Sequence, residues 1–114
     1  MIRTVLTLRV EPSKLAAVLA MYRDEDILQF SLDHSQALAS EISVAADGSG
    51  EVIVTALWPD EAAYRGWLDH PSRQESAPRL ARLLEGAAEV GPGRVFVVDH
   101  AVSKMPSAPI VSQP

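Results

Sequence analysis

The chain opens with an alternation of apolar and polar positions that predicts a β-strand over residues 2–10. One side of this strand is strongly apolar and the other is mixed. The apolar side carries Ile2, Leu6, Leu8 and Val10, and the mixed side carries Arg3, Val5, Thr7 and Arg9. A helix is expected to follow from Pro12, because proline is tolerated in the first turn of a helix. Its buried stripe consists of apolar residues at helical spacing, namely Leu15, Val18, Leu19 and Tyr22.

The acidic run at residues 23–26 predicts an exposed break, after which an apolar face resumes toward His34. Residues 36–45 and 51–58 then predict a second and a third strand, because both segments alternate and the later one is rich in Val, Ile and Thr. The residues Asp47-Gly48-Ser49-Gly50 lie between them. Glycine supplies the positive φ that a tight reversal needs, so these two strands are expected to form an antiparallel hairpin.

A second helical region starts at Pro59-Asp60-Glu61, with Asp60 as the expected N-cap. This helix is predicted to end near Asp69, because Pro71 disfavours helix at the preceding His70. Further helix is predicted in two pieces, over residues 72–76 and 78–85. A loop containing Gly86, Gly91, Pro92 and Gly93 follows, and residues 94–102 predict a fourth strand.

This order of elements predicts an α+β fold of the ferredoxin-like β-α-β-β-α-β type. Such a domain, here residues 1–102, has a four-stranded antiparallel sheet with helices on one face only. The uncovered face holds Arg3 and Arg9 beside apolar residues such as Ile53 and Leu57, which is too apolar to leave fully hydrated. We therefore expect a homodimer that packs these faces together. The proline-containing tail, residues 103–114, is predicted to be flexible or draped over a partner.

Composition narrows the possible partners. The chain has 114 residues, enough for one domain, and a net charge of -5, which disfavours a role in binding nucleic acid. It contains no cysteine, and its three histidines show no metal-ligand spacing, so no metal site is expected. No signal-peptide pattern and no apolar run of membrane-spanning length occur, so the sequence predicts a cytoplasmic protein without a membrane partner.

The segment DGSGEVIVTALWPDEAAYRGWLDHP, residues 47–71, resembles the antibiotic biosynthesis monooxygenase family. That family combines a glycine-containing hairpin, a strand that ends in Trp, an acidic helix start and a following Glu-Ala-Tyr. The resemblance implies a dimeric α/β barrel with a ligand cavity between the sheet and the helices of each subunit. It also implies oxidation of a polyketide-like aromatic or phenolic small molecule by O2, without metal, flavin or haem as cofactor.

The resemblance carries over to individual residues only in part. Trp58 matches the strand-end Trp of the family, and Tyr64 matches the Tyr six residues later. The family has an Asn four residues before the Trp, where this chain has Val54. It also has an Arg in the next helical segment, for which Arg73 and Arg79 are candidates.

His70 is the leading candidate for a general base, with His34 and His100 behind it, because histidine is the usual proton acceptor near neutral pH. Each candidate also has an ordinary structural interpretation. Trp58 and Tyr64 are each typical of an ordinary core aromatic residue, and His70 of a capping or solvent-facing residue. Arg73, Arg79 and Arg82 are most typical of an exposed helix face that pairs with Glu75 or Glu85.

A second branch of the same superfamily degrades haem, and there the match fails. Trp67 fits the helix Trp of that branch, but Ser76 stands where it has a His, and Leu6 or Thr7 where it has an Asn. Three hypotheses therefore remain: a cofactor-independent monooxygenase, a non-catalytic dimer that binds a small molecule, and a structural dimerisation module.

Overall fold

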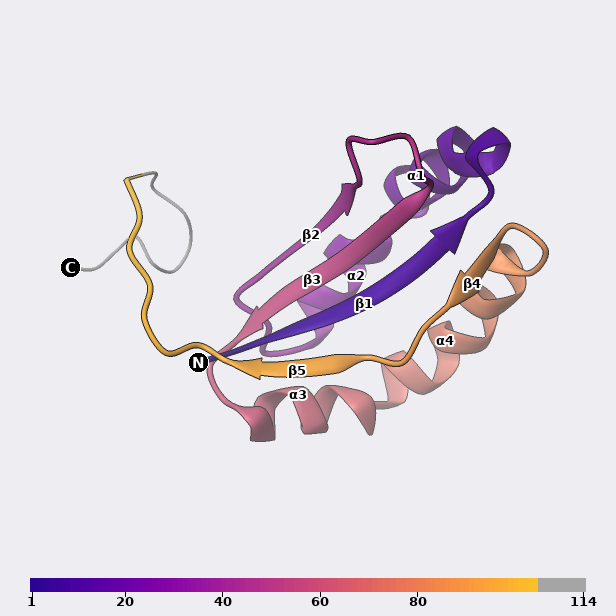
Figure 1. The fold of residues 1–114 in the computed structure, drawn as a ribbon. Coiled ribbons are helices and arrows are strands. Elements are labelled where there is room, and N and C mark those ends of the chain that lie inside the picture. The colour runs from indigo at the N-terminus through magenta and orange to yellow at the C-terminus, as the bar shows by residue number, and fades with distance from the viewer. Residues whose placement is uncertain (105–114) are drawn as a thin grey trace.

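An antiparallel sheet lies at the centre of the protein, with helices packed on one of its faces (Figure 1). The computed structural model describes residues 1–104. In chain order the elements are β1 (Ile2–Val10), a 3-10 turn η1 (Pro12–Lys14), α1 (Leu15–Asp24), α2 (Ile27–His34), β2 (Ala39–Val44), β3 (Glu51–Trp58), α3 (Glu61–Leu68), α4 (Pro71–Leu84), β4 (Ala88–Val90) and β5 (Arg94–Val97). This architecture confirms the predicted α+β, ferredoxin-like class. No helix within the described part of the chain is long and apolar enough to cross a membrane.

The strands follow the order β2-β3-β1-β4, and β5 also pairs with β1. The last edge of the sheet is therefore divided, with β4 alongside Leu8–Val10 and β5 alongside Ile2–Val5. Between the two pieces, the amide of Gly91 still donates a hydrogen bond to the Thr7 carbonyl at 2.9 Å, while Pro92 has no N–H to donate. The prediction of a continuous loop across residues 86–93 was wrong, because Ala88–Val90 pairs with β1. The prediction of a strand reaching residue 102 was also wrong, because β5 ends at Val97, which pairs with Ile2 at the start of β1.

The hydrophobic core lies on the helix side of the sheet. Leu8 and Val52 are fully buried there and face each other across β1 and β3. Residues from α1 and α4 complete this cluster, with Val18 and Tyr22 from the first helix and Leu84 from the second. A smaller cluster at the other end of the sheet joins Ile2, Trp58 and Ala63.

Two helix boundaries test the sequence predictions. A break is confirmed only in the second half of residues 23–26, since α1 ends at Asp24, and Asp26 between α1 and α2 has a left-handed φ of 50°. The predicted gap near Ala77 is wrong, because α4 runs unbroken through Pro78. A proline inside a helix costs about 3 kcal/mol, and here Leu80 and Leu84 are packed against the core on the far side of it. Tertiary packing therefore overrides the local preference.

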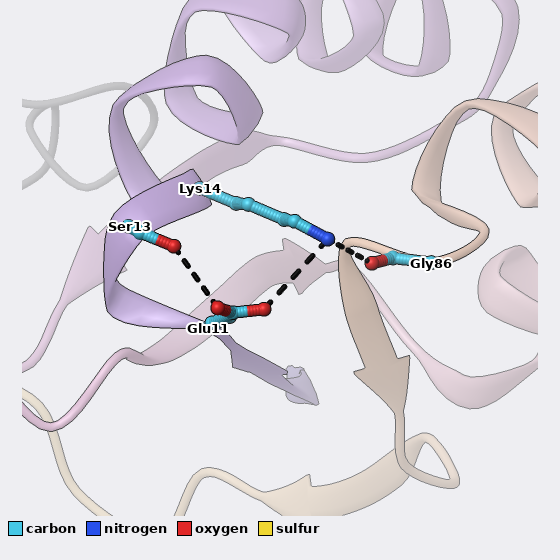
Figure 2. A network of polar contacts seen from close by, with 4 residues as sticks. All are labelled: Glu11, Ser13, Lys14 and Gly86. Atoms are coloured by element: carbon cyan, nitrogen blue, oxygen red, sulfur yellow. Dashed lines mark hydrogen bonds and ion pairs between the residues drawn. The ribbon is translucent and has the colours of Figure 1, made fainter.

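A polar network closes the end of the molecule where β1 leads into η1 (Figure 2). The Lys14 ammonium group donates a hydrogen bond of 2.7 Å to the Gly86 carbonyl, which follows α4, and lies 3.7 Å from the Glu11 carboxylate. The Ser13 hydroxyl donates to the same carboxylate at 3.1 Å. The network ties the loop between α4 and β4 to the first helical turn. The tail predicted over residues 103–114 lies outside the described residues, apart from its first two positions.

The hairpin turn gives a matched pair of glycines for a stability test. Gly48 and Gly50 both have positive φ, of 77° and 87°, but only Gly50 is buried against the Val10 backbone. A Cβ at position 50 would lie 2.0 Å from the Val10 carbonyl oxygen, and one at position 48 meets nothing within 4 Å. We expect Gly48→Ala to lower the free energy of unfolding by about 1 kcal/mol, and Gly50→Ala to lower it by about 3 kcal/mol or more. Urea denaturation measures both, and equal losses would contradict the close approach.

Tyr22 predicts a pH dependence of stability. Its side chain is 3% exposed, and burial raises the pKa of its phenol above the ordinary value of 10.0. Because the folded state holds this proton more tightly than the unfolded chain, the stabilisation is complete below pH 10.0 and is lost as the pH rises through the folded-state pKa. We expect the unfolding free energy of the wild type to fall more steeply above that pH than that of Tyr22→Phe. Parallel curves for the two proteins, measured by denaturant unfolding from neutral to alkaline pH, would refute this.

Candidate functional site

Trp58 and Tyr64 meet at the connection between β3 and α3. Trp58 is the last residue of the strand, and Tyr64 lies on the first turn of the helix. Their ring centroids are 5.3 Å apart in an edge-on arrangement with an interplanar angle of 60°, a favourable geometry for aromatic pairs. The predicted N-cap is confirmed, since the Asp60 carboxylate accepts a hydrogen bond of 2.8 Å from the Ala63 amide. This cap fixes the angle at which α3 leaves the strand.

The indole of Trp58 is buried, and its polar atom is satisfied by β1. Its Nε1–H donates a hydrogen bond of 3.0 Å to the Thr4 hydroxyl. Thr4 lies on the helix side of β1, two residues after Ile2. Ile2 is the partner of Trp58 in the register between β1 and β3. Sequence reasoning missed Thr4. The available signal was that it interrupts the otherwise apolar alternation from Ile2 to Val10 with a hydroxyl.

Tyr64 is half-buried, and its hydroxyl lies beside the chain that joins β4 to β5. A Cβ built on Gly93 would lie 3.4 Å from the Tyr64 hydroxyl oxygen, so the backbone passes close to the phenol at this point. Thr4, Trp58, Tyr64 and Gly93 together define a cluster that we call the aromatic corner. It combines a buried indole with a half-buried tyrosine.

His70 lies at the junction of α3 and α4 and caps the second helix. Its Nδ1 accepts a hydrogen bond of 3.0 Å from the Ser72 amide, so in the neutral ring the proton is carried by Nε2. Its ring packs beside Trp67, with centroids 5.7 Å apart. Nδ1 already accepts a hydrogen bond and Nε2 carries the proton of the neutral ring. This geometry gives His70 a capping role and leaves it no free basic nitrogen.

The two candidate arginines have different surroundings. Arg73 is half-buried in the first turn of α4, and its guanidinium donates a hydrogen bond of 3.4 Å to the Leu68 carbonyl at the end of α3. Arg79 is exposed and forms an ion pair of 2.5 Å with Glu25, at the corner between α1 and α2. The expected pairing with Glu75 or Glu85 was therefore wrong for Arg79, since its partner comes from a distant helix.

The remaining candidates lie apart from the aromatic corner. His34 stacks on Phe30 with ring centroids 4.2 Å apart, and its Nδ1 lies 2.8 Å from the Phe30 carbonyl oxygen. His100 is exposed, beyond β5. Val54, in the position of the family Asn, packs against the main core cluster.

A hollow of about 150 Å³ lies at the β2–β3 hairpin and includes none of the residues of the aromatic corner. It is lined by Ser43, Val44, Ala45, Glu51 and Ile53. Residues 1–104 contain no group of three or more His, Asp or Glu side chains arranged to hold a metal ion.

Comparison with solved structures identifies the fold. One similar structure is named an antibiotic biosynthesis monooxygenase, with 20% identity and a TM-score of 0.63 over 90% of this chain and 100% of the other. Another is SnoaB from Streptomyces nogalater, named a cofactor-independent oxygenase, with 16% identity and a TM-score of 0.64 over 89% and 95%. A third is a dimeric ferredoxin-like protein from an uncultured marine organism, with 10% identity and a TM-score of 0.70 over 91% and 100%.

No protein-family model matches the chain, and no curated protein matches its sequence. The similar structures span nearly the whole of both chains, so the protein has the fold that antibiotic biosynthesis monooxygenases and dimeric ferredoxin-like proteins share. At these identities the likeness concerns the fold, and the chemistry must be argued from the site.

The capping role of His70 is testable by a pair of substitutions. Asparagine is a good N-cap and alanine is not, so we expect His70→Ala to lower the free energy of unfolding by about 1 kcal/mol and His70→Asn to preserve it. Chemical denaturation measures both variants. If His70→Asn loses as much stability as His70→Ala, the side chain does not act as a cap.

Proposed function

We propose that the protein is a cofactor-independent monooxygenase that oxidises an aromatic, phenolic small molecule of polyketide type with O2. The ligand is placed at the aromatic corner, between the sheet and α3. The observation that carries the proposal is the Trp58–Tyr64 pair, with ring centroids 5.3 Å apart and Tyr64 half-buried. The fold shared with a protein named a cofactor-independent oxygenase supports it.

The proposed reaction needs little from the protein beyond positioning and charge stabilisation. An anthrone loses a proton to water, and the resulting anion donates electrons to O2. One oxygen atom is then incorporated at the reacting carbon, and the other leaves as water. Trp58 supplies an apolar wall that excludes bulk water, and the Tyr64 hydroxyl donates a hydrogen bond to the phenolate oxygen.

Positive charge near the ligand is assigned to Arg73 rather than to Arg79. Arg79 is already neutralised by Glu25 on another helix. Arg73 lies three residues after His70, at the same helix junction as Trp67, and bonds only a backbone carbonyl there. His70 is assigned a positioning role, because its bond from the Ser72 amide orients the start of α4, which carries Arg73.

The proposal includes a homodimer joined through the sheet face opposite the helices. Ile53 and Phe96 on this face are 36% and 41% exposed, which is substantial for large apolar side chains. A structural neighbour with this fold is named a dimeric ferredoxin-like protein. We place the protein in the cytoplasm, as its sequence predicts.

The alternative function is a non-catalytic dimer that binds a small molecule. Val54 favours this alternative, because its apolar side chain packs in the core where the related enzymes have an amide that donates hydrogen bonds. The aromatic corner would then bind its ligand and leave it chemically unchanged. The third hypothesis, a structural dimerisation module, relies on the tail beyond residue 104, which lies outside the described residues.

Turnover separates the first two functions. We expect the purified protein to accelerate oxidation of an anthrone above the spontaneous rate, and Tyr64→Phe to slow it by about tenfold or more. Quinone absorbance and O2 consumption report the reaction. Tyr22→Phe is the matched control, because it removes a phenol hydroxyl from the other hydrophobic cluster and is expected to leave the rate unchanged.

One outcome would contradict the catalytic function, and another would contradict the role of Tyr64. A rate equal to the spontaneous one, with the anthrone bound and recovered intact, favours the binding alternative. Equal rates for wild type and Tyr64→Phe would remove Tyr64 from the proposed mechanism.

A further inference from the structure

The last edge of the sheet contains a one-residue bulge between β4 and β5, which both pair with β1 (Figure 1). Continued by one step, the register of β4 places Gly91 opposite Thr7, and the Gly91 amide indeed donates to the Thr7 carbonyl at 2.9 Å. Continued back by one step, the register of β5 places Gly93 opposite Leu6. Pro92 is therefore the extra residue. It suits a bulge, because it has no N–H to donate to a neighbouring strand.

The bulge decides which residues of the last edge face the helices. Gly93 shares the helix side with Leu6, and Val95 lies on the same side, opposite Thr4. If the register of β4 continued without the extra residue, Arg94 would lie opposite Thr4 instead. A bulge beside a site re-aims side chains in this way. Here it keeps a charged residue out of the aromatic corner and places a glycine there.

Gly93 lies directly against the phenol of Tyr64. A Cβ built on Gly93 would lie 3.4 Å from the Tyr64 hydroxyl oxygen, which is ordinary van der Waals contact, and Gly93 does not have a positive φ. Neither a left-handed backbone nor a steric clash therefore requires glycine at this position. Glycine also serves where a ligand approaches the backbone closely. The missing side chain leaves space at the phenol oxygen.

The Tyr64 hydroxyl is available to a ligand. No residue within 1–104 forms a hydrogen bond with it, and Tyr64 is only half-buried. The sheet surface beside it is also open. Val95 is 41% exposed although it lies on the helix side of β5, and Gly93 is exposed as well. The approach to the hydroxyl therefore runs along the edge formed by β5, past position 93.

We propose that Gly93 is a specificity-determining residue of the aromatic corner. Its lack of a side chain, at the position that the Pro92 bulge gives it, keeps the Tyr64 hydroxyl open to a ligand arriving from the β5 edge. The inference rests on the proposed function for the identity of the ligand and goes beyond it, because it names the residue that controls access to the phenol. A larger side chain at position 93 excludes ligands that place an oxygen against this hydroxyl.

Acetylation of the phenol by N-acetylimidazole measures access without any substrate, and peptide mass spectrometry locates the acetyl group. We expect Tyr64 to react in the wild type and to react more slowly in Gly93→Ala. In Gly93→Val the rate is expected to fall by about tenfold or more, since the reagent then needs a local opening of the chain. Gly66→Ala is the matched control, because Gly66 is exposed on α3 and a Cβ there meets nothing within 4 Å. Tyr22, which is 3% exposed, is the internal reference, because it reacts only when the fold opens.

Anthrone oxidation tests the consequence for the site. We expect Gly93→Ala to lower kcat/KM by about tenfold, as the loss of one hydrogen bond to a developing oxyanion does. The double variant Gly93→Ala/Tyr64→Phe is expected to lose no more than Tyr64→Phe alone, because both changes remove the same hydrogen bond. Gly66→Ala is expected to keep the wild-type rate.

The two assays separate this inference from the proposed function. Acetylation rates of Tyr64 that are equal in the wild type and both Gly93 variants, with Tyr22 unreacted, would overturn the role of Gly93. An unchanged anthrone rate in Gly93→Ala, or losses that multiply in the double variant, would overturn it too, because Gly93 would then not act through the hydroxyl. A wild-type protein that does not oxidise anthrone would overturn the proposed function, and the acetylation rates alone would then decide whether Gly93 controls access.

Discussion

The antiparallel register between β1 and β3 is the constraint on which the other features depend. It places Leu8 opposite Val52 in the core and Ile2 opposite Trp58 at the aromatic corner. On the other face it places Arg9 opposite Glu51. A slip of one residue would turn every side chain to the wrong face, burying arginines among the helices. Gly50 helps to set this register, because its carbonyl accepts the Val10 amide at 2.9 Å at the point where a Cβ would not fit.

Features set by local chemistry could be predicted from the sequence. The glycines at 48 and 50 indicated the hairpin, and β3 has the predicted bounds of Glu51–Trp58. Asp60 indicated the start of α3, whose first residue is Glu61. Each of these depends on residues close together in the chain. The strand β4 and the continuity of α4 through Pro78 depend instead on β1 and on the core, which local patterns do not specify.

The site shows the same division between local and distant contacts. The hydrogen bond from Trp58 to Thr4 joins β3 to β1, and the ion pair from Arg79 to Glu25 joins α4 to the corner between α1 and α2. Neither could be predicted, because both require the packed fold. His70 illustrates a subtler limit. Its residue type suggests a base as well as a helix cap, and the hydrogen bond that Nδ1 accepts from the Ser72 amide, two residues later, shows the capping role.

The distribution of charge connects the two faces of the sheet to the proposed chemistry. On the sheet face opposite the helices, Arg3, Arg9 and Arg94 are balanced by Glu41, Glu51 and Glu89, so the net charge of -5 belongs to the rest of the chain. A negatively charged exterior repels anions, which disfavours the entry of a preformed phenolate. Under the proposed function, the ligand therefore enters as the neutral phenol or anthrone and ionises after it is bound. Tyr64 and Arg73 then stabilise only the anion that forms at the site. Their stabilisation therefore increases the rate of the reaction and does not strengthen the binding of the neutral ligand.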